Sequence, residues 1–309
     1  MVVNRGAADR TGPAGATAGD RGQLRSWFSL LILALAWGST FLWIDLALAE
    51  GIPPALLTFG RAVVATAALL AIGWPMWRSW NGNGPRARDL FLAAALCNAM
   101  PFLLFSLGQR TVASGVAGVL NATTPLWTVL LEVALSRGRR VGSRQFAGVA
   151  IGFVGVCLVF APWRDGVAWT VGVPLILLAA AGYAAGFVLM ARRLIPTAAS
   201  PRELASLQML AATVLLALAV PFEPVPSLPT AKGVLAVVML GTLCTAFTFT
   251  IAYRMLATEG ATRTAVVGYL IPVVAVLLGV VFLSERIRPM AMLGMLVVLA
   301  GVAWTRSHR

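Results

Sequence analysis

The side chains that could do chemistry are few, and most lie inside long apolar segments. Arg61 lies about eight residues into such a segment, which is ~12 Å deep if the segment is helical. A charge at that depth costs at least about 2.5 to 3.5 kcal/mol in a bilayer and normally faces the interior of the protein. Arg61 could therefore attract a carboxylate or phosphate of a ligand, or form a structural ion pair with Asp45 near the end of the preceding segment.

Other polar and aromatic side chains gather near the middle of the apolar segments. In a cavity, an aromatic face would stack on a ligand and hydroxyl or amide groups would orient it. The alternative is helix packing, in which Ser and Thr bond to their own backbone and amides bond between helices. With both interpretations open, the candidate cavity residues are Trp37, Ser39, Thr40, Arg61, Asn98, Asn121, Tyr183, Gln208, Thr245 and Tyr269.

The sequence offers no set of residues for catalysis or metal binding. The single histidine, His308, lies at the end of the chain, and Cys97, Cys157 and Cys244 lie in apolar segments without metal-ligand spacing. An enzyme would need a nucleophile with a base, or a metal set. A phosphate-binding loop, which ATP-driven transport requires, is also missing. We expect no enzyme, no metal and no cofactor.

Composition predicts an all-α membrane protein. Of 309 residues, 59% are apolar and 11% charged, and the apolar residues form blocks of roughly 20, the length that crosses a bilayer. Residues 1–25 are polar and glycine-rich, and are expected to form a disordered tail. Ten transmembrane helices are predicted, at 27–49, 53–76, 89–109, 111–135, 144–162, 168–190, 200–221, 232–255, 259–283 and 287–305.

The basic residues predict the orientation of these helices. Eighteen fall on the side of the N-terminus, whereas the opposite side has only Arg110, Arg164, Lys232, Arg286 and Arg288. Basic loops stay in the cytoplasm, so both termini are expected there, in a multi-pass protein of the cell membrane. The net charge of +13 belongs to short loops rather than to one face of a soluble fold, so nucleic-acid binding is not expected.

The chain repeats itself. An offset of 147 residues aligns Pro54 with Pro201, Thr66 with Thr213 and Phe102 with Phe249, and it also aligns Leu96–Ala99 with Leu243–Ala246. One residue less aligns Trp37 with Tyr183, Phe41 with Phe187, Gly148 with Gly294 and Gly155 with Gly301. These matches predict two five-helix units, residues 26–163 and 168–305.

Because five is odd, the second unit must enter the membrane in the opposite sense to the first. Such inverted repeats allow the two halves to exchange conformations, which opens a central site alternately to each side. The fold is therefore predicted to be two inverted five-helix repeats, with the geometry of an alternating-access carrier.

The chain resembles the drug/metabolite transporter superfamily, in particular its ten-span members with two EamA-like domains, over residues from about 30 to 305. In the first half the resemblance rests on Trp37-Gly38-Ser39-Thr40-Phe41, Pro54 with Arg61, and Asn121 with Pro125. In the second half it rests on Pro272, Ser284-Glu285-Arg286 and Gly294. One departure is that this family usually has an acidic residue after the fourth span, matching Glu285, where this chain has Ser136-Arg137-Gly138-Arg139-Arg140.

The resemblance implies a secondary transporter of small metabolites, often an exporter of amino acids or related compounds. The expected partners are a small polar or amino-acid-like substrate and the lipid bilayer, and a homodimer is left open. Efflux of drugs or lipophilic cations is the alternative, although Arg61 would repel a cation. A membrane protein without transport activity is the third hypothesis.

The predicted orientation can be tested by labelling. After Cys97, Cys157 and Cys244 are replaced by alanine, Arg139→Cys should react with a membrane-impermeant maleimide only once the cells are permeabilised. Labelling of that cysteine in intact cells would show that the protein has the opposite orientation, with both termini outside.

Overall fold

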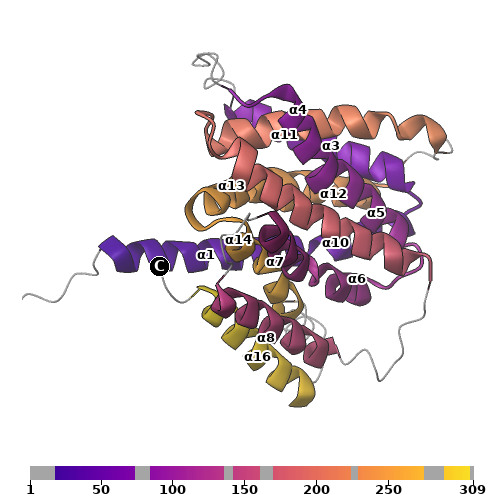
Figure 1. Cartoon of the computed structure of the whole chain (residues 1–309). Helices are drawn as coiled ribbons and strands as arrows, with labels where there is room; N and C mark the ends of the chain where they lie inside the picture. Colours follow the sequence, from indigo (N-terminus) through magenta and orange to yellow (C-terminus); the bar gives the residue numbers. More distant parts are fainter. Residues whose placement is uncertain are drawn as a thin grey trace, which may run out of the picture.

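The computed structural model describes residues 18–73, 84–135, 142–160, 170–223, 229–274 and 289–306. Within these ranges all regular secondary structure is helical (Figure 1). The first half contains α1 (Ala18–Gly38), α2 (Thr40–Ala49), α3 (Pro54–Gly73), α4 (Ala87–Ala94), η2 (Ala95–Ala99), α5 (Met100–Gly108), α6 (Ser114–Asn121), α7 (Thr124–Leu135) and α8 (Ser143–Phe160). The second half contains α10 (Gly172–Leu189), η3 (Met190–Leu194), α11 (Pro201–Ala217), η4 (Val220–Phe222), α12 (Ala231–Gly241), η5 (Thr242–Phe247), α13 (Thr248–Glu259), α14 (Ala261–Ala265) and α16 (Pro289–Arg306).

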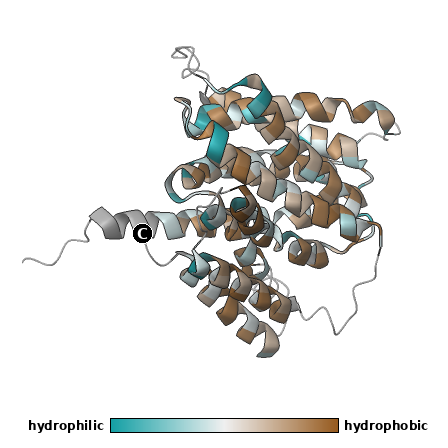
Figure 2. Ribbon diagram, in the orientation of Figure 1, coloured by the Kyte–Doolittle hydropathy of each residue, from teal (hydrophilic) through white to brown (hydrophobic). Residues whose placement is uncertain are grey.

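Several of these elements join into helices long and apolar enough to cross a bilayer. Within the described ranges there are seven: Ser26–Ala49, Pro54–Ile72, Ala87–Gly108, Val116–Leu135, Gly172–Leu194, Pro201–Phe222 and Ala231–Glu259. Three shorter apolar helices, Ser143–Val159, Ala261–Val274 and Pro289–Thr305, lie where the fifth, ninth and tenth spans are predicted. Figure 2 shows hydrophobic residues along the helices and the more hydrophilic residues mainly at their ends.

The N-terminal boundary differs from the prediction. α1 begins at Ala18, so residues 18–25, expected to belong to a disordered tail, are helical. No proline interrupts the chain between Ala18 and the first span, and a helix extends more easily than it nucleates. Residues 1–17 lie outside the described part, as do the loop of Arg137, Arg139 and Arg140 and the segment of Ser284, Glu285 and Arg286.

Local signals fix where helices begin and turn. Ser200 and Glu203 form a capping box at the start of α11, each side chain accepting a hydrogen bond from the other residue's backbone N–H. Thr230 caps α12 by accepting from the N–H of Gly233 at 3.0 Å. Gly260, between α13 and α14, has a φ of 82°, a conformation that only glycine adopts readily.

Residues that the 147-residue offset makes equivalent come into contact between α3 and α11. The Thr66 and Thr213 hydroxyl oxygens lie 2.9 Å apart, and Thr213 also donates to the Met209 carbonyl at 2.9 Å. Thr66 therefore donates to Thr213. The two equivalent helices meet at a point where each contributes the same residue.

The equivalent helices α8 and α16 pack through glycines and lie side by side at one edge of the molecule (Figure 1). A Cβ on Gly301 would lie 2.4 Å from the backbone nitrogen of Gly152. One on Gly155 would lie 2.5 Å from that of Val298. Small residues thus allow the two backbones to approach closely, as in many membrane helix pairs.

Two long helices contain a π-helical segment at equivalent positions. η2 and η5 begin 147 residues apart, at Ala95 and Thr242. A π-helical turn leaves some carbonyls without their usual partners and is frequent at functional sites. These two segments bring polar side chains into the core, as described below.

The glycine contact predicts a stability effect. Gly301→Ala should lower the melting temperature of the purified protein, because its Cβ would collide with backbone atoms that cannot move independently. Gly118→Ala is the matched control, since its Cβ would make ordinary contact with Phe41 at 3.8 Å and alanine favours helix. Equal melting temperatures for the two variants would contradict this account of α8 and α16.

Candidate functional site

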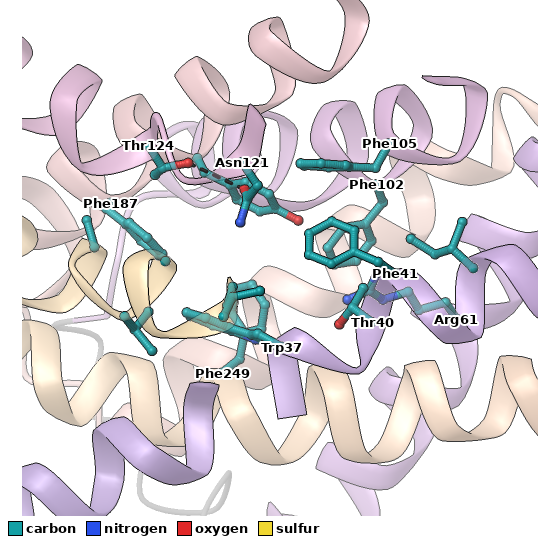
Figure 3. Close-up of a pocket in the computed structure, with 16 residues that line it drawn as sticks. Trp37, Thr40, Phe41, Arg61, Phe102, Phe105, Asn121, Thr124, Phe187 and Phe249 are labelled. Atoms are coloured by element: carbon teal, nitrogen blue, oxygen red, sulfur yellow. Dashed lines mark hydrogen bonds between the residues drawn. The ribbon is translucent and has the colours of Figure 1, made fainter. Parts of the chain in front are cut away.

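A pocket lies inside the bundle and is lined by residues from both halves of the chain (Figure 3). Its internal volume is about 60 Å³, room for roughly four to six water molecules at about 10 to 15 Å³ each. Its wall includes Trp37, Thr40, Phe41, Ile44, Arg61, Phe102, Phe105, Asn121, Thr124, Tyr183, Phe187, Phe249, Ala265, Val267, Gly268 and Ile271.

Seven of the sixteen residues of this wall are aromatic, and five of them form one continuous series of ring contacts. Phe41 contacts Phe105 with ring centroids 5.6 Å apart, and Phe105 contacts Tyr183 at 5.9 Å. The series continues from Tyr183 to Phe187 at 6.5 Å and from Phe187 to Trp37 at 6.3 Å. These spacings are typical of stabilising aromatic pairs, so the wall holds its shape through contacts among its own rings.

Trp37 is fixed further by a hydrogen bond. Its indole N–H donates to the Thr248 hydroxyl at 2.9 Å, and its ring meets Phe249 edge-on with centroids 6.4 Å apart. Thr248 donates in turn to the Cys244 carbonyl at 2.8 Å. The residue after the π-helical segment η5 thus positions an aromatic residue of the first helix.

Arg61 supplies the charge in this pocket and is only 4% exposed. Its Nε donates to the Thr245 hydroxyl at 2.7 Å, and its Cζ lies 3.7 Å from the centroid of the Phe102 ring. No other hydrogen bond joins its guanidinium to a described residue. Because a guanidinium carries five N–H donors, the terminal nitrogens remain available to a ligand.

The π-helical segment η5 explains how Thr245 comes to accept this bond. Its hydroxyl donates to the carbonyl of Leu240, five residues earlier, at 2.7 Å. With its proton committed there, its oxygen accepts from Arg61. Arg61 is therefore held by Thr245 on one side and by the Phe102 ring on the other.

Neutral polar groups complete the wall. Asn121 and Thr124 project from one side, and Thr124 donates to the Asn121 side-chain oxygen at 3.4 Å (Figure 3). Thr40 lies near Arg61 (Figure 3). Among the described wall residues there is no carboxylate, and in the described ranges no three His, Cys, Asp or Glu side chains lie close enough to hold a metal.

Five of the ten candidate residues lie on this wall: Trp37, Thr40, Arg61, Asn121 and Tyr183. Ser39, Asn98, Gln208, Thr245 and Tyr269 do not. Ser39 donates to the Ala36 carbonyl at 2.9 Å, and Tyr269 donates to the Val149 carbonyl at 2.8 Å. These two hydroxyls stabilise helix contacts, which is the alternative that the sequence left open.

Asn98 and Gln208 belong to a buried polar cluster outside the pocket. Gln208 donates to the Asn98 side-chain oxygen and accepts from the Tyr253 hydroxyl. Asn98 lies in η2, as its counterpart Thr245 lies in η5. The contact between Gln208 and Asn98 is thus the repeat equivalent of the contact between Arg61 and Thr245.

The ion pair considered for Arg61 is not formed. Asp45 is exposed on α2 whereas Arg61 is buried, and no ion pair joins these two described residues. Arg61 is left facing the pocket.

Most of the aromatic wall was not predicted from the sequence. Phe41, Phe102, Phe105, Phe187 and Phe249 line the pocket, yet none was a candidate. A signal was available, because the repeat pairs Phe41 with Phe187 and Phe102 with Phe249. Phenylalanines at equivalent positions of the two halves both face the central pocket, so the repeat match could have marked them as wall residues.

Comparisons with known proteins agree with this architecture. The model of the EamA-like transporter family matches twice, over residues 25–161 and 170–307. The chain is 30% identical over 285 residues to a Streptantibioticus cattleyicolor protein named "Probable terminal-alkyne amino-acid exporter", covering 89% of this chain and 91% of that one. It is 29% identical over 287 residues to the inner membrane transporter YedA of Escherichia coli, covering 89% and 88%. A crystal structure with 20% identity superposes with a TM-score of 0.71 over 92% of this chain and 96% of that one, which supports the fold alone.

Apolar helices long enough to cross a bilayer, gathered around an internal pocket, define a multi-pass membrane protein. The chain belongs to the EamA-like transporter family of the drug/metabolite transporter type. It is a protein of the cell membrane, like its inner membrane relative.

The pocket wall can be mapped with a matched pair of cysteine variants. In a background without other cysteines, Asn121→Cys should react with a small charged thiol reagent, because Asn121 lines the pocket. Asn98→Cys should stay protected, because Asn98 is fully buried beside Gln208. Equal reactivity of the two cysteines would contradict this assignment of the wall.

Proposed function

We propose that this protein is a secondary transporter that exports a small amino-acid-like metabolite across the cell membrane by alternating access. The observation that carries the proposal is Arg61, a buried guanidinium on the wall of an aromatic pocket whose terminal nitrogens bond to no described residue. The relative named as an amino-acid exporter supports the same substrate class.

In this proposal Arg61 binds the substrate carboxylate. A guanidinium and a carboxylate form charge-assisted hydrogen bonds, often two in parallel. At 4 Å and an effective dielectric constant near 20 their attraction is about 4 kcal/mol before desolvation. A carboxylate would also neutralise the charge that the described wall leaves uncompensated.

The aromatic series would pack against the side chain of the substrate. Rings from Trp37, Tyr183 and Phe187 present apolar faces, which suit an aliphatic or aromatic side chain. A ring face can also attract an ammonium group, so a zwitterion is compatible with the site. The alternative substrate class, a lipophilic cation, is disfavoured because Arg61 would repel it and the described wall offers no carboxylate.

Alternating access would use the two halves of the chain. We propose ten membrane spans in two inverted five-helix repeats, residues 26–163 and 168–305, with both termini in the cytoplasm. The two family matches support this division, and so does the contact between the equivalent residues Thr66 and Thr213. The positive-inside rule supports the orientation.

The symmetry of the buried hydrogen bonds also supports two exchanging halves. Arg61 on α3 binds Thr245 in η5, and Gln208 on α11 binds Asn98 in η2. Both bonds join the same pair of repeat positions, but only one carries a charge. In the proposed substrate site only the first half of the chain contributes a charge, although the two halves share the same hydrogen-bond positions. Such asymmetry suits a substrate that carries an anionic group at one end.

The proposal predicts the effect of changing Arg61. Arg61→Gln should lower the efflux of preloaded apolar L-amino acids from cells at least about tenfold, because it removes a charge-assisted bond of about 1.5 to 3 kcal/mol. Arg61→Lys should retain part of the flux, since it keeps the charge but loses the planar fork. Protein amount in the membrane would be measured for each variant.

Asp45→Asn is the control for this experiment. Because Asp45 forms no ion pair with Arg61, the variant should transport as the wild type does. Unchanged flux in Arg61→Gln would refute the carboxylate site. Rescue of Arg61→Gln by Asp45→Asn would instead favour a structural ion pair between them.

A further inference from the structure

A second, separate cavity opens on the flank of the bundle. This lateral groove has a volume of about 540 Å³ and lies between α3, the start of α11, η5 and α13. Its wall is mainly apolar, with Ala68, Leu69, Leu243, Ala246, Phe247 and Ile251 among its residues. None of its residues belongs to the central pocket.

Two arginines border the groove. Arg202, in the first turn of α11, and Arg254, on α13, are both exposed. Neither forms an ion pair with a described residue, and the described wall of the groove contains no acidic side chain. The side chain of the nearby Glu203 accepts a hydrogen bond from the backbone N–H of Ser200. The border of the groove is therefore positive, and no described acidic side chain compensates its charge.

The dimensions fit one leaflet of a bilayer. Between Thr242 and Arg254, both on the wall, the chain rises by at most about 18 Å, the value for an α-helix at 1.5 Å per residue. Half of the hydrocarbon core is about 15 Å. If Arg254 lies at the interface, where arginine is stable, the apolar part of the groove extends to the middle of the membrane.

We propose that this groove binds an anionic phospholipid, with an acyl chain along the groove and the phosphate between Arg202 and Arg254. Arginine forms planar, charge-assisted bonds with phosphate oxygens, and basic pockets between membrane helices suit such head groups. In the proposed orientation the lipid belongs to the cytoplasmic leaflet. A second copy of the chain fits less well, because a two-fold contact would bring the same arginines together.

The proposed lipid would contact η5, the segment that also holds Arg61 of the central pocket. Leu243 and Ala246 of η5 line the groove, while Thr245 of the same segment accepts the hydrogen bond from Arg61. The two sites thus share one short π-helical segment. They are distinguishable in experiment, because no side chain lines both.

Native mass spectrometry of the full chain can test this proposal. Delipidated protein in a neutral detergent would be mixed with equal amounts of phosphatidylglycerol and phosphatidylcholine that carry the same acyl chains. The wild type should retain one phosphatidylglycerol at least about fivefold more often than phosphatidylcholine. Arg202→Gln with Arg254→Gln should remove this preference, and lysine at both positions should preserve it.

Two further variants separate charge from shape. Arg86→Gln with Arg193→Gln makes the same change in charge away from the groove and should leave the preference intact. Ala68→Phe should lower lipid retention by filling the groove, without any change in charge. Millimolar sn-glycerol 3-phosphate should not displace the lipid, because the acyl chain supplies part of the binding.

Three results would overturn the proposal. The first is equal lipid retention in the groove variant and in its charge-matched control. The second is equal retention of phosphatidylcholine and phosphatidylglycerol by the wild type. The third is displacement by glycerol phosphate together with unchanged retention in Ala68→Phe, which would indicate a site for free phosphate groups.

Discussion

A guanidinium inside an apolar helix bundle must be solvated by the protein itself. In this chain that requirement falls on Arg61, which is 4% exposed and has no acidic partner in the described structure. Thr245 accepts one hydrogen bond, and the Phe102 ring covers one face of the guanidinium. Neither contact neutralises the charge. A site that keeps an uncompensated cation in an apolar environment, at a cost of several kcal/mol, is most simply explained by a ligand that carries the opposite charge.

The repeat makes this arrangement possible. η5 interrupts its helix just where the hydroxyl of Thr245 can reach the Leu240 carbonyl and still accept from Arg61. Its counterpart η2 places Asn98 against Gln208, so the same frame holds a neutral pair in the other half. Equivalent positions of the repeat thus carry unlike residues, a charged pair in one case and a neutral pair in the other. Close backbone contact between α8 and α16 and the Thr66–Thr213 bond hold equivalent helices together.

Hydrophobic length predicted the helical membrane fold and the positions of its apolar segments, because this signal extends over tens of residues. The direction in which each side chain points was harder to predict. Spans such as α10 are apolar on all sides, so no amphipathic pattern shows which face lines a cavity. Tyr183 lines the pocket whereas Tyr269 bonds to Val149, although both are tyrosines in apolar spans. The repeat marked Leu96–Ala99 and Leu243–Ala246 as equivalent, but no residue pattern indicated that these segments are π-helical. The aromatic wall could have been found only by giving weight to the matched phenylalanines.

The most direct test of a carboxylate site at Arg61 is a comparison of ligand pairs that differ only in that group. Binding of apolar L-amino acids and of their amides to the purified protein would be measured by calorimetry, for the wild type and for Arg61→Gln. We expect the wild type to bind an acid about 10- to 100-fold more tightly than its amide, because the amide lacks the charge-assisted bond. Arg61→Gln should abolish this difference. Equal affinity of acid and amide in the wild type, or the same preference in the variant, would contradict it.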